Sequence, residues 1–113
     1  RWGMLFADLN DARRVTFLED LVRRERLPPQ GFFAETGRHL GELENFYEFQ
    51  MFLSLVDKHD ADSPAIQQQV AGFLDHRNFF LARRAYDYLA DRELDDKTSR
   101  QVAEFREQHR DRL

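Results

Sequence analysis

The sequence predicts an all-α fold of about six helices, arranged as three stacked antiparallel helical hairpins in either a repeat-like array or a compact bundle. Apolar residues recur at three- and four-residue spacing along most of the chain, as in amphipathic helices. Residues 43–56 are apolar around most of a helical circumference, and such a helix must be covered on two or three sides. Short sequence patterns also recur roughly 33 residues apart, near the period of helical repeats.

The composition favours one folded helical domain spanning residues 1–113. The chain is 42% hydrophobic and 34% charged, which is typical of a folded chain and too apolar for disorder. Because it begins with Arg1 instead of Met, we expect it to be excised from a longer chain.

Charge and cysteine content exclude several classes of function. The chain contains no cysteine, which excludes disulfides and thiolate chemistry and fits a cytoplasmic location. Since no apolar run approaches the roughly 18 residues of a membrane span, we expect a soluble protein without a membrane partner. The formal net charge of −4 argues against a dedicated nucleic-acid binder, because such proteins gain affinity by neutralising phosphates. The 11 phenylalanines are unusually many and supply either a core or an interface.

The N-terminal third predicts two helices. An amphipathic pattern over residues 2–9 indicates a short first helix. The second is expected to begin at Asn10 or Asp11, which suit an N-cap, and to end at Pro28 and Pro29. Its predicted buried stripe consists of Val15, Leu18, Leu21 and Val22.

The middle of the chain predicts a weak helix and then a central one. Three glycines lower helix stability between residues 30 and 41, so we expect a short helix over 32–40, with a break at Gly37 as the alternative. The central helix is expected from about Glu42 to Lys58, packed by the elements before and after it.

Turn signals divide the C-terminal half into three helices. Residues 59–64 predict a turn, with Asp62 or Ser63 as N-cap and Pro64 at the first helical position. The helix that follows is expected to bury Ile66, Val70, Phe73 and Leu74. The next, over 78–91, is expected to bury Phe79, Ala82, Tyr86 and Leu89. The last, capped by Asp95 or Asp96, is expected to bury Val102, Phe105, His109 and Leu113.

Two pairs of similar segments support an internal repeat. Asn45-Phe46-Tyr47 matches Asn78-Phe79-Phe80, and Gln69-Val70-Ala71 with Phe73 matches Gln101-Val102-Ala103 with Phe105. The resulting units would be 11–42, 43–76 and 77–109. Their length is close to the tetratricopeptide period, but the consensus residues of that family are absent. Chance similarity between two amphipathic hairpins is the alternative.

The titratable residues form no convincing catalytic or metal site. Glu35, His39 and Glu42 share a helical face, but the paired Glu-x-x-His motifs of di-iron proteins are missing. His59 and Asp60, a second possible metal-binding pair, fall in a turn at a helix end and are expected to serve as part of that turn. No nucleophile elbow, phosphate-binding loop or dinucleotide fingerprint is present. We therefore expect a non-catalytic protein without a metal or cofactor.

Arginines interleaved with aromatic residues suggest an alternative function. Arg77, Arg83 and Arg84 alternate with Phe79 and Phe80, a pattern that suits a nucleic-acid or anion-binding accessory domain. Nearby aspartates would neutralise much of this charge, so we regard nucleic acid as the less favoured partner.

The adjacent aromatic pairs Phe32-Phe33 and Phe79-Phe80 indicate a protein interface. Neighbouring residues on a helix point about 100° apart, so both members of such a pair cannot easily reach one narrow core. At the end of a stack the second member would be exposed and could bind a partner. We therefore predict an adaptor or scaffold domain that binds a protein or peptide, or a second copy of itself. Its predicted contact residues are Phe32, Phe33, Phe80, Arg84 and Tyr88.

Overall fold

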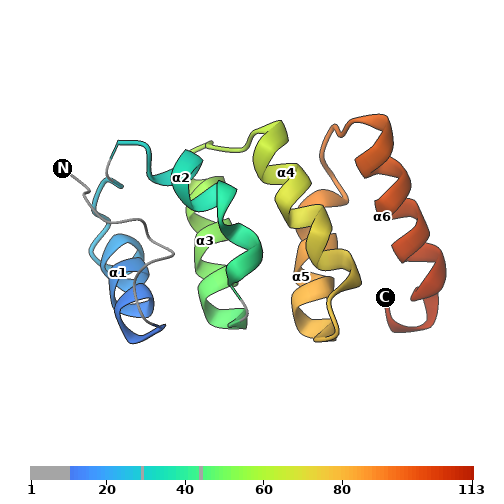
Figure 1. Ribbon diagram of the computed structural model, residues 1–113, viewed down its shortest axis with the longest axis horizontal. Coiled ribbons are helices and arrows are strands. Elements are labelled where there is room, and N and C mark those ends of the chain that lie inside the picture. The colour runs from blue at the N-terminus through green and yellow to red at the C-terminus, as the bar shows by residue number, and fades with distance from the viewer. Residues whose placement is uncertain (1–10, 29, 44) are drawn as a thin grey trace. The chain divides into compact units, whose positions relative to one another are not determined.

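The fold is all-α, as predicted. The computed structural model describes residues 11–28, 30–43 and 45–113, which contain six α-helices and no β-strand (Figure 1). The α-helices are α1 (Asp11–Arg23), α2 (Phe32–Arg38), α3 (Phe46–Lys58), α4 (Pro64–Ala71), α5 (Phe79–Leu89) and α6 (Asp96–Gln108). Three of these helices are each followed by a short 3₁₀ turn: η2 (Leu40–Glu42) after α2, η3 (Gly72–Asp75) after α4 and η4 (Arg110–Arg112) after α6. The helix expected over residues 2–9 lies outside the described residues.

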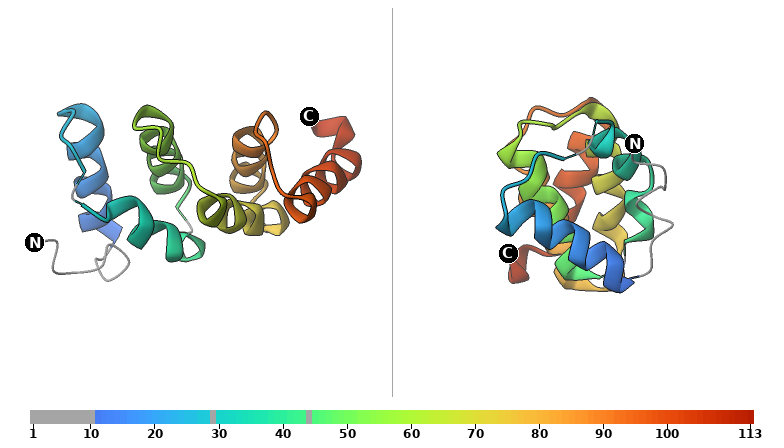
Figure 2. Two further views of the ribbon diagram at one scale, coloured as in Figure 1. Left: turned by 90° about the horizontal axis from the view of Figure 1, so that it is seen from above. Right: turned by 90° about the vertical axis from the view of Figure 1, so that its left-hand side faces the viewer.

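The chain divides into two compact units. The N-terminal unit ends at Asp62 and carries α1 to α3, and the C-terminal unit, Ser63–Leu113, carries α4 to α6. Within the first, α1 lies beside α3, and within the second, α4 packs on both α5 and α6 (Figure 2). Contact between helices two apart in the sequence is what stacked hairpins produce. The stacking of all three hairpins stays a prediction.

Helix α1 buries a narrower stripe and ends earlier than its sequence predicts. Leu18 and Leu21 are buried, but Val22 is 37% exposed. The helix ends at Arg23, well before the prolines, because Glu25 adopts a left-handed conformation with φ 53°. A residue in this conformation just beyond the last turn is a common helix terminator, although glycine usually occupies it.

Helix α2 follows a glycine that the backbone requires. Gly31 has φ 82°, a left-handed conformation that is costly for residues with a Cβ. Gly37 is buried within the helix, so the alternative of a break at this position is wrong. The helix ends at Arg38, and the predicted last residue, Leu40, starts the η2 turn instead.

Helix α3 is bounded by side-chain and backbone caps. The Asn45 carboxamide oxygen accepts hydrogen bonds from the N–H groups of Tyr47 (2.8 Å) and Glu48 (3.3 Å), which fixes the start at Phe46 instead of the expected Glu42. At the other end, the Ala61 N–H donates to the Val56 carbonyl at 2.9 Å. Asp60 lies between them with φ 51°, completing a Schellman motif.

The apolar residues between positions 49 and 56 of α3 are buried, as predicted. Each is at most 6% exposed: Phe49, Met51, Phe52, Leu53, Leu55 and Val56. Phe52 lies in a cluster of rings, with its centroid 6.0 Å from Phe32 and 6.1 Å from Phe33. Phe17 of α1 extends the cluster, 5.6 Å from Phe32. The two adjacent phenylalanines of α2 therefore both contact Phe52 from within the N-terminal unit.

A charged pair is also buried between α1 and α3. Glu48 is fully buried, and both of its carboxylate oxygens lie 3.2 Å from Nε of Arg14. Removing one member of such a pair leaves an uncompensated buried charge. The pair thus fixes the register of α3 against α1, and the sequence analysis did not identify it.

The helices of the C-terminal unit begin at capping residues. The Ser63 hydroxyl accepts from the Ile66 N–H at 3.2 Å and the Asp95 carboxylate from the Thr98 N–H at 2.7 Å, so the cap in each case is one of the two residues expected there. The backbone N–H and the side chain of Thr98 together hold the pKa of Asp95 below its ordinary value. The Asn78 side chain caps α5 by accepting a hydrogen bond from the Phe80 N–H at 2.9 Å.

The four caps form two pairs with matching hydrogen bonds, and the pairs are spaced as the sequence repeat is. Asn45 and Asn78 both accept from the residue two positions on, and Ser63 and Asp95 both accept from the residue three positions on. The first pair of matched segments therefore starts α3 and α5 in the same way, and the second pair belongs to α4 and α6, which begin at similar caps. Whether the similarity reflects a genuine repeat stays open.

Helix α5 buries a face that the sequence analysis partly misplaced. Ala82 and Leu89 are buried as predicted, but Phe79 and Tyr86 are half-buried. The residues that face the interior are Leu81, Ala82, Ala85, Tyr88 and Leu89. The interior therefore shares Ala82 and Leu89 with the expected stripe but is rotated away from Phe79 and Tyr86, and this rotation determines which side chains of α5 remain outside.

Candidate protein-interaction surface

Three aromatic rings form a stack between α5 and α6. Phe105 is buried in the middle, with Phe79 at 6.2 Å and 15° on one side and Tyr86 at 5.4 Å and 30° on the other. The spacing of seven residues places Phe79 and Tyr86 on the same side of α5. Their half-burial is thus explained by packing on α6 and not on the deeper interior.

Guanidinium groups cover both ends of this stack. Arg112 lies over the Phe79 ring at 4.0 Å. Arg106 lies 5.6 Å from the Tyr86 ring centroid, and its Nε donates to the Tyr86 hydroxyl at 2.8 Å. Cation–π contacts of this kind contribute about 0.5–1 kcal/mol each at exposed sites. These arginines are therefore engaged in holding α6 to α5.

Phe80 lies on the opposite side of α5 from the interior. Its side chain is 73% exposed, although its neighbours Phe79 and Leu81 are half-buried and buried. The 100° step of the helix explains this, since the residues on either side of Phe80 already occupy the α6 side and the interior. Most of the Phe80 side chain is therefore accessible on the outside of α5.

Polar residues continue the same face along α5. Residues 80, 83, 84 and 87 recur at three- and four-residue spacing and share one side of the helix. We call this side the α5 outer face, made of Phe80, Arg83, Arg84 and Asp87. Arg83 donates through Nε to Asp87 (3.3 Å) and through a terminal nitrogen to the Arg112 carbonyl (3.2 Å). Arg84 is partly buried.

The predicted contact residues separate into buried and exposed groups. Phe32 and Tyr88 are 0% and 3% exposed, so the expectation that they offer a surface does not fit the structure. Both are large apolar side chains whose burial stabilises the fold, and Tyr88 is further covered by the Arg92 guanidinium at 3.7 Å. Phe33 is half-buried beside His59, with ring centroids 5.9 Å apart. Phe80 and Arg84 belong to the α5 outer face.

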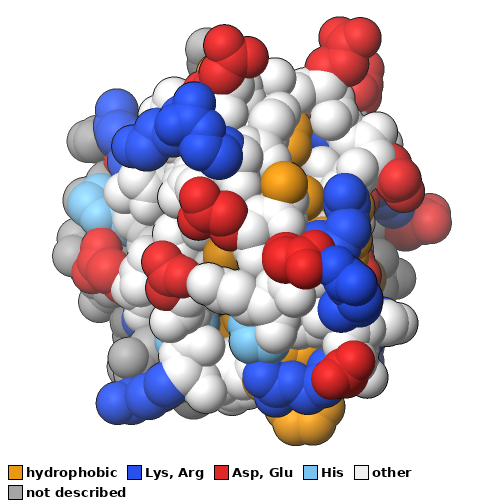
Figure 3. Space-filling model, turned by 90° about the vertical axis from the view of Figure 1, so that its right-hand side faces the viewer, with side chains coloured by type: hydrophobic (Ala, Val, Ile, Leu, Met, Phe, Trp, Pro, Cys, Tyr) orange, Lys and Arg blue, Asp and Glu red, His pale blue; other side chains and the backbone are white. Residues whose placement is uncertain are grey.

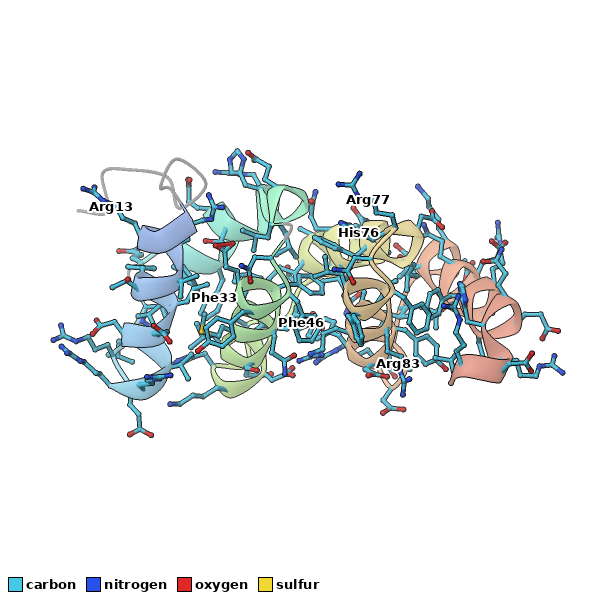
Figure 4. All side chains as sticks on the ribbon, turned by 90° about the horizontal axis from the view of Figure 1, so that it is seen from below. Arg13, Phe33, Phe46, His76, Arg77 and Arg83 are labelled. Carbon is cyan, nitrogen blue, oxygen red and sulfur yellow. The ribbon has the colours of Figure 1, made fainter. Side chains whose placement is uncertain are left out.

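Two of the three arginines of the anion-binding alternative, Arg77 and Arg83, do not converge (Figure 4). Arg77 precedes α5, next to His76, whose Nδ1 accepts from the Asn78 N–H at 2.9 Å. Figure 4 shows the labelled Arg77 and Arg83 on opposite edges of the C-terminal unit. Two guanidinium groups that point apart cannot bind one phosphate, which weakens this alternative.

The face formed by α6 carries charges of both signs. Figure 3 views the molecule from this side and shows basic and acidic side chains interspersed, with hydrophobic atoms between them. Neighbouring pairs such as Arg110 with Glu107 neutralise each other locally. This surface lacks the single-sign field that attracts nucleic acid.

One candidate metal ligand, Glu35, pairs with an arginine, and the other two pair with each other. Glu35 forms an ion pair with Arg38 at 2.7 Å, and His39 Nδ1 lies 2.7 Å from Glu42. Across residues 11–28, 30–43 and 45–113, no three histidine or acidic side chains form a group that could hold a metal ion. The same part of the chain contains no helix long and apolar enough to cross a membrane.

Comparison with protein-family models, curated proteins and solved structures finds no match to this chain.

Proposed function

We propose that the chain is a non-catalytic protein-interaction module whose contact surface is the α5 outer face. The observation that carries this proposal is the 73% exposure of Phe80 in an otherwise well-packed helix. Burying a phenylalanine side chain contributes about 1.5–3 kcal/mol, and Phe80 leaves most of that free energy available to a partner. Its exposure is therefore better explained by association than by folding.

The neighbours of Phe80 suit a protein partner. Arginine and phenylalanine are enriched in the cores of protein interfaces, whereas most surface side chains contribute little to binding. Arg83 and Arg84 lie one turn after Phe80, and Asp87 one turn after those. A mixed polar border around one aromatic anchor matches a protein surface better than a phosphate backbone.

Site-specific photo-crosslinking tests the proposal. A benzoylphenylalanine placed at position 80 of the full chain should yield a discrete crosslinked protein after irradiation in cells. The same probe at Arg100, an exposed position of α6, is the matched control and should yield much less. An excess of unlabelled wild-type chain should compete with the product, whereas the Phe80→Ala chain should compete at least about tenfold less well.

Two results would overturn the proposal. One is the absence of any crosslinked product specific to position 80. The other is equal competition by the wild-type and Phe80→Ala chains, which would show that the phenylalanine contributes nothing to the contact.

A further inference from the structure

We infer that His109 is a pH-sensitive switch: its neutral ring holds Arg112 over the Phe79 ring, and its protonation releases the η4 turn from α5. This inference goes beyond the proposed function and does not depend on it. It rests on a histidine, an arginine and a phenylalanine that contact one another where α6 ends.

His109 is held in a defined position between α6 and η4. Its backbone N–H donates to the Phe105 carbonyl at 3.0 Å, and its own carbonyl accepts from the Arg112 N–H at 2.8 Å. Its ring is half-buried, with the centroid 4.4 Å from that of the Phe105 ring and 5.3 Å from that of the Phe79 ring. The imidazole therefore lies beside the part of α5 that η4 covers.

The contact between His109 and Arg112 requires a neutral imidazole. A terminal guanidinium nitrogen of Arg112 lies 2.8 Å from Nδ1 of His109. Guanidinium groups have donors and no acceptor, so Nδ1 must accept and the ring proton must lie on Nε2. A second proton on the ring removes this acceptor and places two cations side by side. Because histidine changes charge between about pH 8 and about pH 5, mild acid should break the contact.

The guanidinium that contacts His109 also covers Phe79, with its Cζ 4.0 Å from the ring centroid. The η4 turn contains no buried residue, so apolar packing does not fix it to α5. Arg83 donates to the Arg112 carbonyl at 3.2 Å, but an exposed hydrogen bond exchanges readily with water. An imidazolium 5.3 Å from Phe79 also competes with Arg112 for the face of the ring. Protonation should therefore free Arg112 and uncover one side of Phe79, next to Phe80.

Other charged side chains surround this contact. From α5, Arg83 pairs with Asp87 at 3.3 Å, and from η3, Asp75 lines a small pocket with Phe105 of α6. His76, the other histidine of the C-terminal unit, lies at the opposite edge of that unit from Arg83 (Figure 4). The charged residues closest in sequence on α6 and η4 are Arg106, Glu107, Arg110 and Asp111. Carboxyl groups ordinarily titrate about two pH units below histidine and guanidinium groups far above it, so mild acid changes the charge of the imidazole first.

Proton NMR of the full chain, titrated from about pH 8 to about pH 5, tests the inference. Side-chain protons of Arg112 lie in the shielding region above the Phe79 ring, so at the start of the titration their resonances should be shifted upfield. They should lose at least half of that shift by the end, with the same midpoint as the His109 ring protons. In His109→Gln, whose side chain does not titrate, the Arg112 resonances should stay constant. His39→Gln, in the N-terminal unit, is the matched control and should titrate like the wild type.

The inference fails if the Arg112 resonances stay in place while His109 titrates, because protonation then leaves η4 on α5. It also fails if they move equally in the wild type and in His109→Gln, because another group is then responsible. The methyl resonances of the buried Val102 mark the folded state and should not change. Their loss at the acid end of the titration would show global unfolding and contradict a local switch.

Discussion

Helices α3 and α5 begin with the same kind of cap but lie in different surroundings. Each starts with an asparagine cap followed by two aromatic residues, Asn45-Phe46-Tyr47 and Asn78-Phe79-Phe80. In α3 the second aromatic residue is anchored, because the Tyr47 hydroxyl donates to Glu19 of α1 at 2.9 Å. In α5 the equivalent residue, Phe80, is 73% exposed.

The rest of α3 is also more deeply buried than the rest of α5. Helix α3 is buried on several sides, so that even Glu48 lies in the interior and is paired with Arg14. Helix α5 has a buried side, a side stacked on Phe105 and an outer face. The comparison shows that an equivalent local start is compatible with a helix buried on several sides in one place and a helix with an exposed face in another. The side chains of neighbouring helices decide between them.

The largest effect is expected from truncation in the buried helix. Phe52→Ala should lower the free energy of unfolding by about 3–5 kcal/mol, because it removes a fully buried ring that contacts Phe32 and Phe33. Urea denaturation followed by circular dichroism measures the change. A loss below about 1 kcal/mol would contradict the account of α3 as a buried helix.

A smaller and equal effect is expected from the two asparagine caps. Asn45→Ala and Asn78→Ala should each cost about 1 kcal/mol, since each removes the acceptor for N–H groups in the first helical turn. Hydrogen exchange of the Tyr47 and Phe80 amides should accelerate in the respective variants. Aspartate at either position retains the acceptor and serves as the control. A clear difference in cost between the two sites would show that the repeated sequence does not give equivalent caps.

Much of the fold could be predicted from local sequence chemistry. The caps of α4 and α6 were each narrowed to two neighbouring residues that include the actual caps, Ser63 and Asp95, because short polar side chains satisfy the free N–H groups of a helix start. The all-round apolar character of residues 49–56 likewise predicted their burial. These signals depend on neighbours in the chain and not on tertiary structure.

The remaining features depend on tertiary contacts that one sequence does not specify. The end of α1 requires a left-handed Glu25, and no glycine marks it. The burial of Phe32 follows from its contacts with Phe17 and Phe52, which come from two other helices. For the candidate site, the adjacent aromatic pair at 79–80 directed attention to α5, where Phe80 is exposed. Its rotation, which buries Tyr88 and exposes Phe80, depends on the packing of α5 against α4, η3 and α6.

Thermal unfolding of two adjacent substitutions, Phe79→Ala and Phe80→Ala, tests the central claim that α5 presents an outer face. Phe79 packs on Phe105 beneath Arg112, so its loss should cost roughly 2 kcal/mol and lower the melting temperature by several degrees. Phe80→Ala should leave the melting temperature within about 1 °C of wild type, because the side chain is 73% exposed and alanine favours the helix. Equal falls for the two variants would place Phe80 in the core and remove the surface from which the proposed function is argued.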